Sequence, residues 1–293
     1  MLKHLIRKVI FFLVANIVFI TLCTPVMGET ETGIPVDPQT LPDFVDDFFA
    51  KKMLEHHVPG AAVIIVKDGS VLFSKGYGYA NIENDIPVDP QKTIFRVASV
   101  SKIFTIAGVL KLEEQGLLDL NRDINEYLED FKVENNHEEP LKIKYLLTHT
   151  DGFETRDLGT FVQDPADLLS LKEVLKKDLN SPVQTPGSKI TYGGYGTALA
   201  GYLISQVKNE PFEEYIDDNI FKPLHMDNST FHQVLSDSMK ENIATVYNYE
   251  EDANQFVPTQ FLYVSTAPTG ALSTTPEDMG IFMIALLNKG QYG

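Results

Sequence analysis

Apolar positions recur along this chain with two different periods, and each period predicts a different kind of element. Over 41–57 they follow the three- and four-residue spacing of a helix, at Phe44, Val45, Phe48, Phe49 and Met53. Two short apolar runs, 61–66 and 71–75, then flank Asp68-Gly69, a pair typical of the tight turn between antiparallel strands. The pattern therefore predicts a helix followed by a β-hairpin, whose second strand ends within 76–79.

Most of the remaining apolar segments have the length and spacing of helices. They lie at 95–112, 165–178, 197–207, 212–221 and 279–287. Breaks rich in turn residues separate them, at 148–152 and 182–187, while 233–264 is too mixed to assign. The chain contains no internal repeat, and its 293 residues suffice for one large domain or two smaller ones.

The segment 95–112, FRVASVSKIFTIAGVLKL, is apolar but carries two serines and a lysine, which a buried helix would not normally contain. Side chains three residues apart on a helix share a face, so we expect the Ser99 hydroxyl and the Lys102 amine in one cleft. A serine beside a neutral lysine can act as a nucleophile. The same spacing at Ser205 and Lys208 falls at the polar end of an ordinary helix, so the spacing alone is a weak signal.

The N-terminal segment has the order of a secretory signal. Three cations precede an apolar run that contains the only cysteine, Cys23, and cleavage is expected after Gly28. A membrane anchor in place of cleavage is the alternative. We therefore expect a signal peptide over 1–28, a linker over 29–40 and an extracytoplasmic domain over 41–293. Loss of the signal would make the net charge of −17 more negative, and such a charge repels nucleic acid.

Five segments, in order, resemble the family of serine β-lactamases and penicillin-binding proteins, especially class C β-lactamases, D-alanyl-D-alanine carboxypeptidases and related esterases. They are VPGAAVIIVKDGSVLFSKGYGYA, FRVASVSKIFT, LLTHTDGF, ITYGGYGTALAGYLI and APTGALSTTPEDMGIF. The resemblance implies an α+β fold of the β-lactamase/transpeptidase type, with helices packed on an antiparallel sheet and a mostly helical subdomain. It also implies that Ser99 is the nucleophile, that Lys102 helps to remove its proton and that Tyr192 carries this proton.

Two departures from the family pattern concern the site. The second family motif, Tyr-x-Asn, corresponds here to Tyr192-Gly193-Gly194, so Gly194 stands where the family has a substrate-binding amide. Tyr195 either lines the cleft or packs beneath it. The third motif, Lys or His followed by Thr or Ser and then Gly, does not occur. We therefore expect the C-terminal strands of the fold to be missing and the domain 41–293 to be C-terminally incomplete.

These features together predict an exported serine hydrolase that forms an acyl-enzyme through Ser99. Its substrates would be D-Ala-D-Ala-type peptides, β-lactams or small esters. The alternative is a catalytically impaired, penicillin-binding-like protein for recognition or sensing, which Gly194 and the missing third motif both favour. An α/β-hydrolase is excluded because no G-x-S-x-G motif occurs.

Other residues receive more modest interpretations. The adjacent His56 and His57 point to different helix faces, so no metal site is expected, and no cofactor is expected either. His149 is expected to have a structural role in its loop, and Arg96 to pair with one of many acids. We expect a monomer that takes a small-molecule or cell-wall peptide substrate, and an association with the cell envelope is left open.

Overall fold

A computed structural model describes residues 37–155 and 160–292. The predicted signal peptide and most of the predicted linker lie outside these residues. The chain divides into two compact units, 1–45 and 46–293, and the second contains the features described below. Helix α2 (Leu41–Glu55) spans the boundary, and it ends just before His56 and His57.

A β-hairpin follows α2, as the sequence predicts. Strand β1 (Gly60–Lys67) pairs antiparallel with β2 (Ser70–Asn81), and β3 (Ile86–Pro87) adds to the far side of β2. Asp68 and Gly69 form the turn with φ of 51° and 74°, the left-handed conformation that such two-residue turns require. In the described sheet, β1 is therefore an edge strand.

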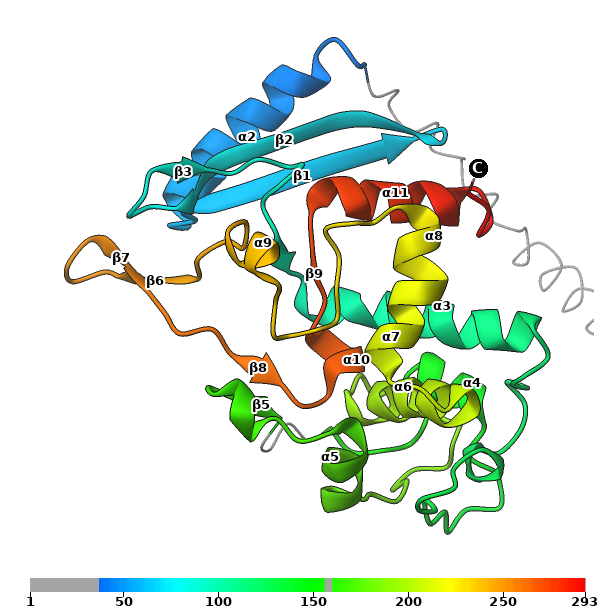
Figure 1. The fold of residues 1–293 in the computed structure, drawn as a ribbon. Coiled ribbons are helices and arrows are strands. Elements are labelled where there is room, and N and C mark those ends of the chain that lie inside the picture. Colours follow the sequence, from blue (N-terminus) through cyan, green and yellow to red (C-terminus); the bar gives the residue numbers. More distant parts are fainter. Residues whose placement is uncertain (1–36, 156–159, 293) are drawn as a thin grey trace, which may run out of the picture. The chain divides into compact units, whose positions relative to one another are not determined.

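Helix α11 (Pro276–Leu287) runs along this hairpin, next to β1 (Figure 1). Its first turn is capped by the Thr275 hydroxyl, which accepts the Asp278 N–H at 3.3 Å. Gly280 allows close approach to the sheet, because a Cβ there would lie 2.4 Å from Cδ1 of Ile64. The predicted helix over 279–287 is confirmed, with its start at Pro276.

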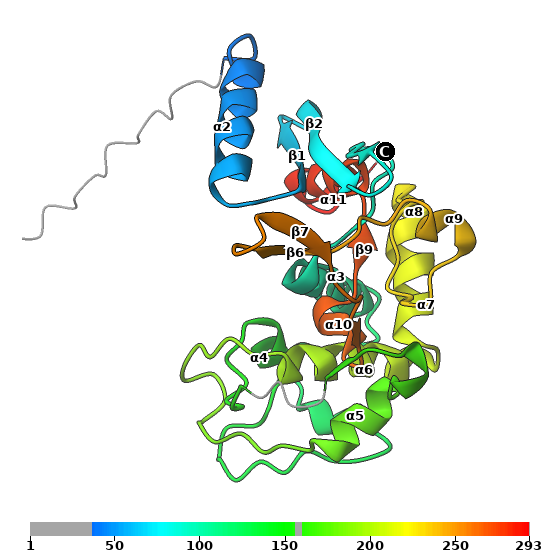
Figure 2. The same cartoon turned by 90° about the vertical axis from the view of Figure 1, so that its left-hand side faces the viewer.

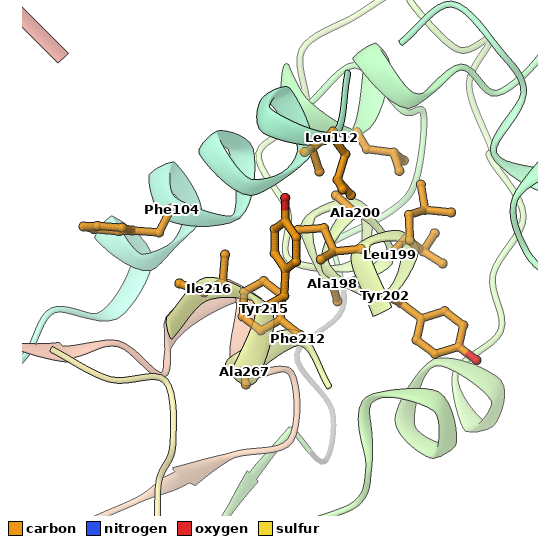
Figure 3. Close-up of a cluster of buried hydrophobic side chains, with 14 of the residues drawn as sticks. Phe104, Leu112, Ala198, Leu199, Ala200, Tyr202, Phe212, Tyr215, Ile216 and Ala267 are labelled. Carbon is orange, nitrogen blue, oxygen red and sulfur yellow. The ribbon is translucent and has the colours of Figure 1, made fainter. Parts of the chain in front are cut away.

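The helical part is built around α3 (Ser101–Glu114), α6 (Tyr195–Lys208) and α7 (Phe212–Ile216) (Figure 2). The first ten residues of α6 are all buried, because their small and apolar side chains pack on neighbours from every side. Figure 3 shows Tyr215, Phe212 and Ile216 of α7 among the alanines and leucines of α6, close to Phe104 and Leu112 of α3. This core supports the start of α3, where the predicted site lies.

Shorter elements connect these layers. The paired strands are β4 (Phe95–Arg96) with β9 (Ser273–Thr274), β5 (Phe161–Val162) with β8 (Tyr263–Val264), and β6 (Tyr247–Glu250) with β7 (Gln255–Pro258). The remaining α-helices are α4 (Ile143–Leu147), α5 (Leu171–Lys177), α8 (Lys222–Leu224), α9 (Asp237–Lys240) and α10 (Ala267–Gly270). Single tight turns occur at η1 (Ala98–Val100), η2 (Ile124–Glu126) and η3 (Pro165–Asp167), and a π-helical turn at η4 (Asp217–Phe221). None of the helices in the described part of the chain is long and apolar enough to cross a bilayer.

Three predicted helices differ from the structure. The segment 95–112 begins as strand β4, because Phe95 and Arg96 pair with residues of β9, and the helix starts only at Ser101. The segment 165–178 splits into η3 and α5, because Ser170 forms a capping box with Glu173 and starts a new helix. The segment 212–221 changes from α-helix to π-helix at Asp217.

Close packing of α6 on α10 provides the first testable prediction. A Cβ on Gly201 would lie 2.3 Å from Cγ and 2.6 Å from Cβ of Pro268, and a proline ring cannot rotate away. A rigid contact this short places the cost near the upper end of the typical range of about 1–3 kcal/mol for overpacking, against which alanine gains about 1 kcal/mol of helix propensity over glycine. We expect Gly201→Ala to lower the free energy of unfolding in urea by about 1 kcal/mol or more.

Gly194→Ala is the matched control, because the nearest atom to its added Cβ would be Thr269 Cγ2 at 3.8 Å, an ordinary contact. Equal stability of the Gly201→Ala variant and the wild type would contradict the packing argument.

Candidate active site

Ser99 lies in the single turn η1, between strand β4 and helix α3, and its side chain is exposed. The turn begins with Ala98 at φ 44°, a left-handed conformation that costs energy for a residue with a Cβ. Ser101 holds this turn through its side-chain hydroxyl. Its hydroxyl donates to the Ala98 carbonyl at 2.5 Å and accepts the Leu272 N–H at 3.0 Å. The two serines of SVSK thus differ, since Ser101 is fully buried and Ser99 is accessible.

Lys102 occupies the first turn of α3, and only 7% of its surface is exposed. Its Nζ donates to Oγ of Ser99 at 2.8 Å and to the carbonyl oxygen of Thr269 in α10 at 3.1 Å. These two acceptors hold the Lys102 amine next to the Ser99 hydroxyl. The predicted proximity of Ser99 and Lys102 is confirmed, although they meet across a turn into the helix and not along one helix face.

Tyr192 comes from the loop before α6 and lies over the same amine, with its ring centroid 4.9 Å from Nζ of Lys102. Hydrogen bonds with Lys102 and with Ser99 lower the pKa of the Tyr192 phenol, because both favour the phenolate. The loop is held by the Thr155 hydroxyl, which donates to the Tyr192 carbonyl at 2.8 Å. The structure thus brings Ser99, Lys102 and Tyr192 together.

His149 packs on Tyr192, with ring centroids 4.6 Å apart and the rings tilted by 47°. Burial, and then the charge of Lys102, lower the pKa of His149, so the imidazole is less readily protonated than a free histidine. The His149 carbonyl accepts the Thr191 N–H at 2.8 Å. The backbone of His149 thus helps to hold the loop at Thr191, its ring packs on Tyr192, and the structural role expected from the sequence stays a prediction.

Gly194 and Tyr195 both border the site. A Cβ on Gly194 would be 3.8 Å from Thr269 Cγ2, an ordinary contact. There is therefore space for a side chain at this position, which glycine leaves empty. Tyr195 does both things that the sequence left open, since it borders the cleft and packs beneath it with 8% exposure. Its burial raises the pKa of the phenol to about 12, and its hydroxyl accepts the Asn180 N–H at 3.3 Å.

A cleft of about 320 Å³ opens at Ser99. Apart from the predicted residues, its lining includes an apolar set formed by Phe161, Val174, Leu175 and Val264, and a hydroxyl set formed by Thr155, Thr160, Thr266 and Thr269. The described residues contain no group of three or more His, Cys, Asp or Glu side chains placed to hold a metal ion. Ser99, Lys102 and Tyr192 place a hydroxyl, an amine and a phenol in mutual contact at this cleft, whose lining also includes Asp178.

A family model for β-lactamase matches residues 45–292 of this sequence. The chain belongs to the β-lactamase family. Protein Flp of Staphylococcus aureus strain N315 is 30% identical over 245 residues, which are 78% of this chain and 46% of Flp. The chain thus spans about half the length of this curated relative.

Solved structures show the same fold. The octameric penicillin-binding protein homologue from Pyrococcus abyssi has a TM-score of 0.74 at 27% identity, over 85% of this chain and 57% of that chain. EstCE1, a hydrolase with promiscuous acyltransferase activity, has a TM-score of 0.73 at 22% identity, over 87% of this chain and 74% of its own. The predicted α+β fold of the β-lactamase/transpeptidase type is confirmed.

Sequence analysis missed several residues that support this β-lactamase-like site. Thr269 contributes a backbone carbonyl, which no side-chain pattern can reveal. Ser101 was visible, but only the fold shows that its hydroxyl joins the turn to Leu272. Arg96 was expected to pair with an acid, and this was wrong: its Nη1 donates to the Leu262 carbonyl at 2.7 Å, and no described carboxylate accepts from it.

Asp151 is a further buried group beside the site. Only 4% of it is exposed, its Oδ1 accepts the Phe153 N–H at 3.0 Å, and its Oδ2 would lie 2.0 Å from any Cβ on Gly196. Burial raises the pKa of this carboxyl to about 6. A side chain at Gly196 would therefore displace this buried carboxyl group from the start of α6.

Removal of the Ser101 hydroxyl tests how the nucleophile turn is held. In the Ser101→Ala variant the buried Leu272 N–H loses its acceptor, and such a loss costs about 1–3 kcal/mol. We expect a decrease of that size in the free energy of unfolding, measured by urea titration. Ser205→Ala, in the other S-x-x-K match, should change it by less than about 0.5 kcal/mol. Wild-type stability of Ser101→Ala would contradict this role.

Asp151→Asn tests the buried carboxyl through the pH dependence of stability. The folded pKa of about 6 lies above the ordinary 3.8, so the folded state binds more protons between these values. The wild type therefore loses stability as the pH rises from about 4 to about 6. Asparagine does not ionise, so the variant should gain about 2 kcal/mol relative to the wild type between pH 4.5 and pH 7.5. A stability difference that is the same at both pH values would contradict the raised pKa.

Proposed function

We propose that this chain is a serine hydrolase that forms an acyl-enzyme through Ser99. The observation that carries the proposal is the contact of one accessible hydroxyl with one buried amine, at 2.8 Å between Ser99 Oγ and Lys102 Nζ, under the ring of Tyr192. A hydroxyl needs an adjacent base to become a nucleophile at neutral pH, and this arrangement supplies two candidate groups. Membership of the β-lactamase family supports the same reaction type.

The proposed reaction begins with attack of Ser99 Oγ on the carbonyl carbon of an amide, lactam or ester. The Ser99 proton passes to the Tyr192–Lys102 pair, and the lowered pKa of Tyr192 supports the phenol oxygen as its first acceptor. The negative charge on the carbonyl oxygen is stabilised by the Ser99 backbone N–H. When the carbonyl re-forms, the bond to the leaving group breaks and the leaving group takes the proton. Water then attacks the ester and releases the acid, and Ser99 regains a proton.

The substrate classes that we propose are D-Ala-D-Ala-type peptides, β-lactams and small esters. The name of the Pyrococcus abyssi penicillin-binding protein homologue supports β-lactams. Phe161, Val174, Leu175 and Val264 support an acyl group with an apolar part, although Asp178 also lines the cleft. A binding or sensing protein is the second candidate, and the specific observation in its favour is the open space at Gly194. Without a side chain there, a substrate carbonyl has one polar partner fewer.

The biological setting follows from the sequence alone and is proposed on that basis. We propose that residues 1–28 are a signal peptide and 29–40 a linker, and that the domain 41–293 acts outside the cytoplasm. We also propose a monomer, although the Pyrococcus abyssi homologue is octameric. Sedimentation of the purified protein decides between these states.

Covalent trapping of the full chain tests the proposal. A fluorescent phosphonate and a fluorescent penicillin should each label the wild type, and Ser99→Ala should reduce labelling on the order of 10³-fold or more, because the attacking atom is lost. Ser205→Ala is the matched control and should keep wild-type labelling. Labelling that persists in Ser99→Ala would rule out the assigned nucleophile. Penicillin labelling that is stable for hours, with no turnover of esters, would favour the sensor over the hydrolase.

A further inference from the structure

One wall of the cleft is the segment 262–264, and its backbone is held from two sides. On one side β8 pairs with β5, with Val264 opposite Phe161, and the Ser265 N–H donates to the Thr160 carbonyl at 2.8 Å. In an antiparallel pair, successive residues direct their backbone groups to opposite edges. The N–H and carbonyl of Val264 therefore face away from β5, and in the described fold no third strand is present to receive them.

The side chain of Gln233 receives them instead. Its Oε1 accepts the Val264 N–H at 2.7 Å, and its Nε2 donates to the Val264 carbonyl at 2.8 Å. A single carboxamide thus reproduces the pair of hydrogen bonds that a neighbouring strand would make. Since Phe161 and Val264 both line the cleft, this amide fixes a surface that a substrate would touch.

Arg96 holds Phe261 and Leu262, the residues that precede β8. Its Nη1 donates to the Leu262 carbonyl at 2.7 Å and approaches Gln233 Oε1 at 3.5 Å, and its guanidinium carbon lies 4.1 Å from the centroid of the Phe261 ring. Burial lowers the pKa of this guanidinium to about 10, which leaves it charged at neutral pH. Its Nε and Nη2 are buried without a hydrogen-bond partner among the described residues. The buried guanidinium therefore contacts one carbonyl oxygen and one aromatic ring. These two contacts compensate only a small part of the free-energy cost of burying its charge.

Arg96 also connects this wall to the nucleophile. It lies in β4, three residues before Ser99, and β4 is held in place by β9. Arg96 and Gln233 therefore link β4, which leads into Ser99, with β8, whose Val264 lines the cleft.

We propose that Arg96 and Gln233 are positioning residues that set the distance between Ser99 and the Phe161–Val264 wall, and so determine which acyl groups fit. The ligand class is an ester or amide with an extended apolar acyl chain. Neither residue touches the reacting atoms. The inference rests on the proposed hydrolase function for its substrate part, while the hydrogen bonds to Val264 can be tested without any activity.

The first experiment measures kcat and KM of the full-length protein on p-nitrophenyl acetate and p-nitrophenyl octanoate. Gln233→Met keeps the length of the side chain and removes both hydrogen bonds. We expect the ratio of kcat/KM for octanoate to that for acetate to fall about tenfold, mainly through KM for octanoate, since a loosened wall binds the long chain less well. Arg96→Met should change the ratio in the same direction.

Gln206→Met is the matched control, because Gln206 also accepts a backbone N–H, that of Glu129, at 3.1 Å. It should leave the octanoate-to-acetate ratio unchanged. If Gln233→Met fails to fold, Gln233→Asn serves instead, since it keeps an uncharged amide but is one methylene too short to make both hydrogen bonds to Val264. A ratio that stays at the wild-type value in the folded Gln233 and Arg96 variants would overturn the specificity role.

The second experiment follows hydrogen exchange of the Val264 amide by NMR. It should exchange at least about tenfold faster in Gln233→Met than in the wild type or in Gln206→Met, while amides of α6 exchange as before. Unchanged protection of Val264 would overturn the positioning role. If the wild type hydrolyses no ester and no phosphonate labels Ser99, the proposed function fails, and the substrate part of this inference fails with it. The hydrogen-exchange rate of the Val264 amide still decides whether Gln233 holds the backbone of this segment.

Discussion

The docking of the short helix α10 against α3 and α6 is the contact on which the site depends. Gly201 lets Pro268 approach α6, and the Thr105 hydroxyl of α3 donates to the Pro268 carbonyl at 2.8 Å. With α10 fixed in this way, the next carbonyl, that of Thr269, reaches the Lys102 amine. The geometry of Ser99 and Lys102 is thus determined by backbone packing in the core, and not by the cleft residues alone.

Around this contact the fold uses polar side chains in place of longer secondary structure. Strands β4, β8 and β9 have two residues each, and they are joined to their surroundings by Ser101, Arg96 and Gln233. Ser101 and Gln233 satisfy backbone groups of Leu272 and Val264 that would otherwise be buried without a partner, while Arg96 binds the carbonyl of the exposed Leu262. A site assembled from such short strands can be adjusted by single substitutions, because each wall depends on few bonds.

The sequence predicted the local part of this arrangement well. Ser99 and Lys102 are three residues apart, and the Asp68-Gly69 turn is encoded in two residues, so neighbouring side chains suffice to find both. Tyr192 is far away in the sequence and was found only through the family resemblance.

The start of α3 was misplaced because an apolar run has no feature that separates β4 from a helix, and the pairing of β4 with β9 decides the matter. The break before α5 was visible in Ser170 and Glu173, whose capping box marks a helix start. The roles of Thr269 and Gln233 depend on backbone groups of distant residues, which a single sequence does not display.

The left-handed backbone of Ala98 restricts the movement of the turn that carries Ser99. Glycine would adopt φ 44° without strain, but it would also let the turn visit many other conformations. Alanine has fewer alternatives, so once the core has forced it into this conformation, Ser99 is held in one orientation before any ligand arrives. Part of the stability of the folded chain is thus given up to keep the turn at Ser99 in one backbone conformation.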